Sequence, residues 1–165
     1  MSLNQSWKSL NEEAYLHHCS WMQEALCLAQ TAGEAGEIPV GAVIIDERGE
    51  AIATGENRRQ RDCDPTAHAE IIALRNAGQV LGSWYLNKCT LYVTLEPCPM
   101  CAGAIIQSRL GLLVYGANEP KSGAIRTVLN LPDSAASNHR LEVISGILES
   151  ACQTQLQTWF ANRRS

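Results

Sequence analysis

Three potential metal ligands lie in two short segments of this chain, and a fold that uses them must bring the two segments together. Cys98 and Cys101 lie within residues 97–101, and His68 lies in the earlier segment 67–70. Residues three positions apart on a helix share one face, so both sulfurs can reach the same ion. Two thiolates and one imidazole suit zinc and leave its fourth tetrahedral position open to water. We therefore expect a fold that brings both segments to one zinc ion per chain.

Glu70 follows His68 by two positions and is not needed as a zinc ligand. A carboxylate beside a metal-bound water is placed to move the protons of that water. We therefore predict that Glu70 is the catalytic acid–base group. The alternatives are core residues, a structural zinc knuckle or a redox motif, because a lone C-x-x-C pair is found in all of them. A structural zinc would need a fourth ligand, and the nearest spare cysteines, Cys63 and Cys89, lack ligand-like spacing.

Length and composition indicate one ordinary globular domain over residues 1–165, with 45% hydrophobic residues and a loose segment at residues 1–10. No apolar run approaches a membrane span, and the N-terminus lacks the apolar segment of a signal peptide. We therefore expect a cytoplasmic protein with no membrane partner. Of the seven cysteines, the five outside the ligand segments are then buried apolar residues or free thiols. A net charge of −4 does not favour nucleic-acid binding, so such binding would depend on local clusters such as Arg58, Arg59 and Arg61.

The hydrophobic pattern predicts alternating helices and strands in one three-layer α/β/α domain. Strands are expected at residues 40–46, 51–54, 90–94, 112–115 and 141–144. Helices are expected at residues 12–32, from 64 to 78 or 82, at 98–108 and at 147–162. The connection from 117 to 140 is long enough to be either functional or disordered.

The two helices at the ligand segments are expected to begin at the zinc site. Asp64 suits the N-cap and Pro65 the first turn of a helix whose opening turns hold His68 and Glu70. A second helix would begin at Cys98. The partial positive charge at a helix N-terminus favours anions and lowers the pKa of a thiol.

The H-A-E and P-C-P-M-C segments resemble the zinc-dependent cytidine/deoxycytidylate deaminase superfamily. The longer strings at residues 64–71 and 91–98 are similar to the bacterial tRNA adenosine deaminases, and the resemblance extends from about residue 21 to 160. It implies a five-stranded mixed sheet with the zinc between the two central helices. It also implies hydrolysis of the wobble adenosine of tRNA to inosine, by a homodimer that binds the anticodon loop. The opening turns of the second helix, residues 102–106, are the expected dimer interface.

The same resemblance implies the substrate-binding residues. Asn57, in the string G-x-N, matches the family's substrate-contacting asparagine, although its residue type alone would favour an ordinary turn. Backbone groups at Ala69 and Pro97 are implied to hold the developing tetrahedral centre. Candidates for contacts to the flanking nucleotides are Glu119, Lys121, Asn138, Phe160 and Arg163. Glu119 replaces an aspartate common in the family, and residues 125–127 replace a smaller, glycine-containing run.

Two other functions remain open on the residues. A guanine or cytosine deaminase acting on a free base is the main alternative, because guanine deaminases also carry the E-P-C-P-M-C string. A structural-zinc interaction module is the third. Metal content and hydrolysis of an aminopurine would distinguish that module from an enzyme.

Overall fold

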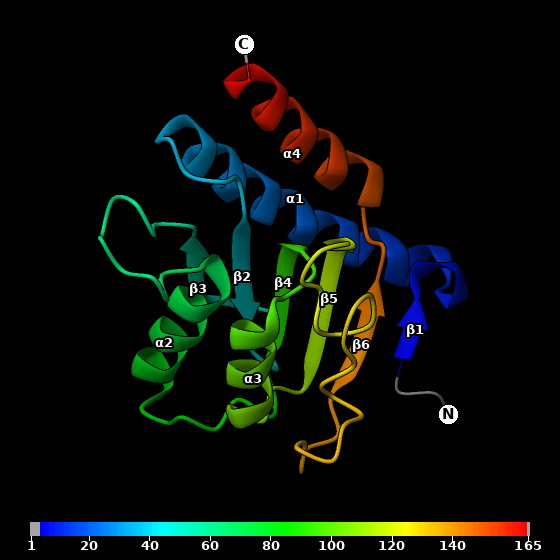
Figure 1. Cartoon of the computed structure of the whole chain (residues 1–165). Helices are drawn as coiled ribbons and strands as arrows, with labels where there is room; N and C mark the ends of the chain where they lie inside the picture. Colours follow the sequence, from blue (N-terminus) through cyan, green and yellow to red (C-terminus); the bar gives the residue numbers. More distant parts are fainter. Residues whose placement is uncertain (1–3, 165) are drawn as a thin grey trace.

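One mixed sheet forms the centre of the structure, a computed structural model that describes residues 4–164 (Figure 1). Its strand order is β1-β6-β5-β4-β2-β3, with β2 antiparallel to both neighbours and every other pair parallel. The strands are β1 (Asn4–Ser6), β2 (Gly41–Ile45), β3 (Ala51–Glu56), β4 (Thr90–Leu95), β5 (Leu112–Ala117) and β6 (Glu142–Ser145). Because only β2 runs in the opposite direction, β3, β4 and β5 end at the edge of the sheet where β2 begins.

Helices cover both faces of this sheet, which confirms the expected three-layer α/β/α class (Figure 1). One face carries α1 (Glu12–Glu34) and α4 (Glu149–Arg163), and the other carries α2 (Ala69–Leu81) and α3 (Pro99–Gln107). A short 3-10 helix, η1 (Trp7–Ser9), precedes α1. No helix in residues 4–164 is both long enough and apolar enough to cross a bilayer.

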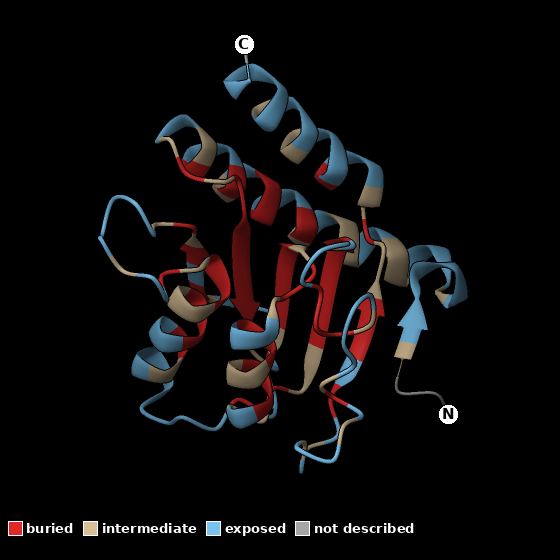
Figure 2. Ribbon diagram, viewed as in Figure 1, coloured by how far each residue is buried: buried red, intermediate tan, exposed pale blue. Residues whose placement is uncertain are grey.

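The central strands are buried on both faces (Figure 2). In β4, Leu91 and Val93 pack into the apolar cluster under α2 and α3, whereas Tyr92 packs into the cluster under α1 and α4. This alternation follows from the two-residue repeat of a strand. Because both faces are covered, the strands appear in the sequence as nearly continuous apolar runs.

The sheet has six strands where five were expected, and the additional one is β1. Asn4 pairs with Val143, and Ser6 with Ser145, in parallel register. Residues 4–9 therefore differ from the loose N-terminus that we expected, and residues 1–3 lie outside the described residues. A short polar strand leaves no periodic signal because its pairing depends on backbone groups, which every residue carries.

Candidate active site

Both helices at the site begin later than the sequence suggested. The carboxylate of Asp64 accepts hydrogen bonds from the amide of Thr66 (2.8 Å) and from its hydroxyl (2.7 Å), so this segment is a turn rather than a helix start. Helix α2 instead begins at Ala69, with His68 as its N-cap. Helix α3 begins at Pro99, with Cys98 as its N-cap. The site therefore lies at two helix N-termini, as expected, but with two of its metal ligands at the caps.

The three predicted ligands lie together. The Nδ1 atom of His68 is 3.5 Å from the sulfur of Cys98 and 3.4 Å from the sulfur of Cys101. Two ligands of a tetrahedral zinc, one nitrogen and one sulfur, lie about 3.5 Å apart at ordinary bond lengths. Within residues 4–164, no further His, Cys, Asp or Glu belongs to this group. The cluster is a candidate zinc site with three protein ligands, and its donor set fits the metal.

Hydrogen bonding within the cluster favours the metal-binding form of one cysteine. The hydrogen bond from the thiol of Cys101 is the largest influence lowering the pKa of Cys98 to about 4, and His68 adds to it. The same bond, together with burial, raises the pKa of Cys101. The bond to Cys98 also raises the pKa of His68, against the effect of burial. Cys98 is therefore a thiolate at neutral pH, as a zinc ligand must be.

Glu70 lies in the first turn of α2, and only 4% of it is exposed. Burial raises the pKa of its carboxyl group, an effect that the nearby His68 partly offsets. A carboxyl group whose pKa is raised toward neutrality can both take and return a proton. Its environment therefore suits the acid–base role that the sequence predicts.

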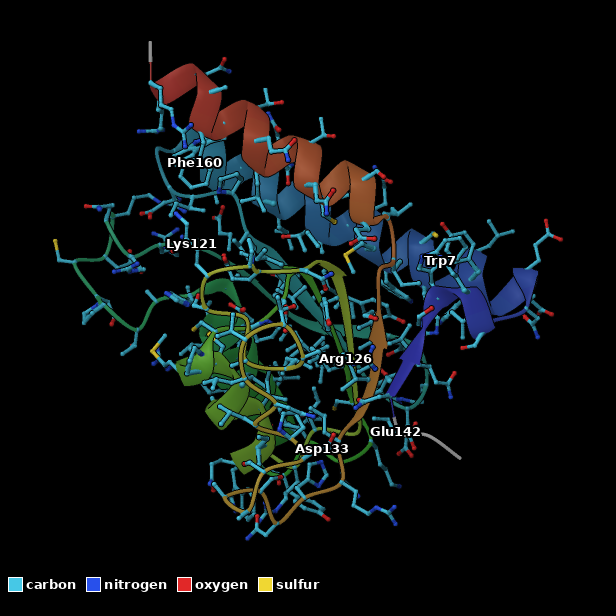
Figure 3. The ribbon with its side chains drawn as sticks, turned by 45° about the vertical axis from the view of Figure 1, so that its right-hand side comes forward. Trp7, Lys121, Arg126, Asp133, Glu142 and Phe160 are labelled. Atoms are coloured by element: carbon cyan, nitrogen blue, oxygen red, sulfur yellow. The ribbon has the colours of Figure 1, made fainter. Side chains whose placement is uncertain are left out.

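A cavity of about 740 Å³ opens beside the ligand cluster. Its walls come from the strand ends, from the loop after β5 and from α4. Figure 3 shows Phe160 on α4 and Lys121 on the loop after β5, on the same side of the molecule. The predicted residues that line the cavity are His68, Ala69, Glu70, Cys98, Asn57, Glu119, Lys121 and Phe160.

Asn57 is buried at this cavity, and both the nitrogen and the oxygen of its side-chain amide form hydrogen bonds. Its side-chain nitrogen donates to the carbonyl of Ile38 (3.2 Å), and its side-chain oxygen accepts from the amide of Arg59 (3.3 Å). An amide group has a second N–H and a second lone pair beyond these bonds. Asn57 is thus a fixed turn asparagine that still has hydrogen-bonding capacity to offer.

Three predicted contact residues do not line the cavity. The carbonyl of Pro97 accepts from the amide of Ala124 at 2.9 Å. The side-chain oxygen of Asn138 accepts from Arg109, which lies near the start of β5, whereas the cavity lies at the end of that strand. The guanidinium of Arg163 stacks on Trp159, 4.0 Å from the ring centroid. Each of these groups is engaged within the chain.

A row of residues on one face of α4 lines the cavity, and the sequence analysis had singled out only Phe160 from it as a contact residue. The row consists of Gln153, Leu156, Gln157, Phe160, Ala161 and Arg164. These positions recur at intervals of three and four, which is one face of a helix. Counting backwards and forwards from Phe160 at that interval would have found the row, and it selects Arg164 rather than Arg163.

A model of the cytidine and deoxycytidylate deaminase zinc-binding region matches residues 16–117. Over 143 residues, the chain is 50% identical to the tRNA-specific adenosine deaminase of Haemophilus influenzae, covering 87% of this chain and 83% of the relative. Over 144 residues it is 45% identical to the tRNA-specific adenosine deaminase of Bacillus subtilis, covering 87% and 89%.

Solved structures of two kinds of deaminase match the chain. A structure from biochemical and structural studies of A-to-I editing by tRNA:A34 deaminases matches with a TM-score of 0.80 and 42% identity, covering 82% of this chain and 98% of that one. A guanine deaminase from Nitrosomonas europaea matches with a TM-score of 0.73 and 30% identity, covering 87% and 84%.

Proposed function

The chain belongs to the cytidine and deoxycytidylate deaminase family, and we propose that it deaminates adenosine to inosine at the wobble position of tRNA. The observation that carries this proposal is a three-ligand zinc site, with the buried Glu70 beside it, at a cavity whose lining includes cationic side chains. The TM-score is higher with the tRNA:A34 deaminase (0.80) than with the Nitrosomonas europaea guanine deaminase (0.73), and the chain is 50% identical to a tRNA-specific adenosine deaminase; both comparisons support the same substrate.

The proposed chemistry is a hydrolysis in which Glu70 moves the protons. His68, Cys98 and Cys101 would hold a zinc ion, which would supply a water with its pKa lowered toward about 7. Glu70 would take one proton from the attacking water and pass it to N1 of the base. It would then move the proton of the new hydroxyl group on C6 to the amino group, which leaves as ammonia while the C6 carbonyl of inosine forms. The N–H of Ala69, in the first turn of α2, lies at the positive end of that helix and suits the developing charge. Adenosine and water are thereby converted to inosine and ammonia.

Binding of the base and of its neighbour is assigned to two sequence-predicted residues that line the cavity, Asn57 and Phe160. Asn57 would use its remaining donor and acceptor on the edge of the flipped base. Phe160 is 39% exposed and lines the same cavity, so its ring is available to stack on a neighbouring base. A loop nucleotide is the substrate form that needs both contacts.

Three cations at the cavity supply the attraction for RNA that the net charge of the chain lacks. Arg59, Lys121 and Arg164 line the cavity, and in residues 4–164 none of them forms an ion pair with an acidic side chain. Unpaired cations converging on one opening suit the phosphates that flank a bound nucleotide. A free base carries no phosphate and would gain nothing from them.

We also propose that the chain is a homodimer acting in the cytoplasm. Part of the expected interface is occupied within the chain, because Ala102, Ile105 and Ile106 are buried in the core. The outer face of α3 remains available through the exposed Met100 and through Gly103, where an added Cβ atom would meet nothing within 4 Å. The bulky Gly103→Arg should leave the monomer folded and lower the sedimentation coefficient, whereas a wild type that sediments as a monomer at micromolar concentration contradicts the dimer.

The substrate is tested by comparing a tRNA anticodon stem-loop bearing wobble adenosine with free guanine and free cytosine. We expect inosine in the stem-loop, read by sequencing, and little ammonia release from either free base. Faster turnover of a free base than of the stem-loop would replace the tRNA proposal with the free-base alternative.

A further inference from the structure

Two loops flank the cavity, and each is bonded to one buried glutamate. The first loop, residues 57–62, carries Asn57 and Arg59, and the second, residues 118–127, carries Glu119 and Lys121. The two glutamates are Glu37, just before β2, and Glu96, just after β4. Neither glutamate takes part in the proposed proton transfers.

Glu96 holds the second loop. It is 1% exposed, and within residues 4–164 its carboxylate accepts hydrogen bonds from that loop alone. Its Oε1 atom accepts from the amides of Ile125 (3.2 Å), Arg126 (2.8 Å) and Thr127 (2.9 Å). Its Oε2 atom accepts from the amide of Glu119 (3.1 Å) and from the hydroxyl of Thr127. Most of these bonds use backbone amides, so they survive the unusual side chains at residues 125–127.

Glu37 holds the first loop in the same manner. It is 2% exposed, and its two oxygens accept from the amides of Arg61 (2.8 Å) and Gln60 (3.2 Å). The guanidinium of Arg61 lies 3.6 Å from the same carboxylate. The next residue, Ile38, accepts the side-chain bond of Asn57. The segment before β2 therefore fixes both the loop and its base-contacting candidate.

Glu37 and Glu96, the anchors of the two loops, flank neighbouring strands of the central sheet. Strands β2 and β4 are neighbours, with Ala42 opposite Val93, and the amide of Gly41 donates to the hydroxyl of Thr94 at 3.3 Å. The start of β2 and the end of β4 thus lie side by side. A carboxylate is acceptor-only, and amide bonds to an ionised group are stronger than neutral ones, so these anchors order the loops before substrate arrives.

We propose that Glu96 and Glu37 are positioning residues that set substrate affinity by holding the two loops of the cavity in their binding arrangement. This inference rests on the proposed function for its kinetic readout. The side chains that they position lie around the cavity, whereas the proton transfers belong to Glu70. Losing either anchor should therefore raise KM for the stem-loop more than it lowers kcat.

Glu96→Gln is the first test, because it keeps the volume and directs an NH₂ group at loop donors. In the zinc-loaded enzyme, amide hydrogen exchange should accelerate in residues 118–128 and stay unchanged in residues 57–62. Losing bonds to a charged acceptor should raise KM for the stem-loop by about tenfold. Glu142→Gln is the matched control, since Glu142 is exposed on β6 and should leave exchange and kinetics unchanged (Figure 3).

Thr127→Val is the second test. Residue 127 is distant in the sequence from the zinc ligands, so this change should leave them in place. It removes the hydroxyl donor to Glu96, whereas Thr127→Ser keeps a hydroxyl and should restore both KM and loop exchange. If Glu96→Gln loses zinc because Cys98 is nearby, the comparison of Thr127→Val with Thr127→Ser still tests whether Glu96 orders the second loop. Glu37→Gln should give the reciprocal exchange pattern, with acceleration confined to residues 57–62.

Unchanged loop exchange and unchanged KM in zinc-loaded Glu96→Gln and Thr127→Val would overturn the positioning role. The positioning role would also be overturned if Thr127→Ser and Thr127→Val raised KM and accelerated loop exchange to the same extent. If the wild type fails to deaminate the stem-loop, the proposed function fails, yet the exchange measurements still decide whether the two carboxylates order the loops.

Discussion

Gly55 of β3 lies so close to Ala69 at the start of α2 that a Cβ atom at residue 55 would overlap the carbonyl oxygen of Ala69. The same atom would lie 2.8 Å from the amide nitrogen of Ala73. Helix and strand therefore pack backbone against backbone. This contact sets the position of α2, and with it the positions of His68 and Glu70.

Replacing Gly55 with alanine should destabilise the protein by at least about 2 kcal/mol, because neither backbone can move without shifting the sheet. The free energy of unfolding from chemical denaturation measures this. Gly103→Ala is the control, since its added methyl group meets nothing within 4 Å. It should be neutral or stabilise the helix by about 0.5–1 kcal/mol. Equal effects of the two changes would contradict the close packing at Gly55.

Cys98→Ala should remove the zinc and lower the melting temperature, because the metal joins the starts of α2 and α3. Metal analysis should find one zinc per chain in the wild type and almost none in the variant. Cys27→Ala should keep its zinc, since Cys27 is exposed and outside the ligand cluster. A zinc-loaded Cys98→Ala would mean that another residue completes the site.

Glu70→Gln should keep the zinc and the melting temperature but lose activity. An acid–base group contributes about a hundredfold to ten-thousandfold, and Glu70 serves several transfers, so we expect the upper end. Single-turnover conversion of adenosine to inosine measures the loss. Retention of more than about a tenth of the wild-type rate would assign the protons to another group.

Lys121→Ala and Arg164→Ala should each weaken stem-loop binding and make it less dependent on salt. Each lost phosphate contact in a single strand reduces the slope of log affinity against log salt by about 0.7. Arg163→Ala is the comparison, because Arg163 stacks on Trp159 and does not line the cavity. A slope change as large for Arg163 as for Arg164 would show that the cavity lining does not identify the RNA contacts.

His18 should make stability depend on pH. Its Nδ1 atom lies 2.8 Å from the hydroxyl of Tyr92, and burial, aided by the charge of His17, lowers the pKa of His18. The unfolded chain then binds the proton more readily, so this stability is complete above about pH 6.5 and is lost as the pH falls toward the folded pKa. His18→Gln should therefore reduce the fall in unfolding free energy between about pH 7 and pH 5. A parallel fall in both proteins would contradict this.

The candidate zinc ligands, a candidate acid–base group and the class of fold could all be identified from the sequence. His68, Cys98 and Cys101 were identifiable because zinc accepts few donor sets and spacings. Glu70 was identifiable because it lies beside a ligand without being needed as one. The central strands and most helices were identifiable because burial on one or two faces imposes a period on the residues themselves.

The residues that surround the ligand cluster could be identified only from the packing of segments that are distant in the chain. Strand β1 pairs through its backbone, so its residues carry no signal. The rim includes Arg164 rather than Arg163 because a helix turns neighbouring side chains in different directions. Glu37 and Glu96 become anchors only when segments distant in the chain bring their amides to one carboxylate. Such contacts depend on the relative placement of elements, which a local pattern does not encode.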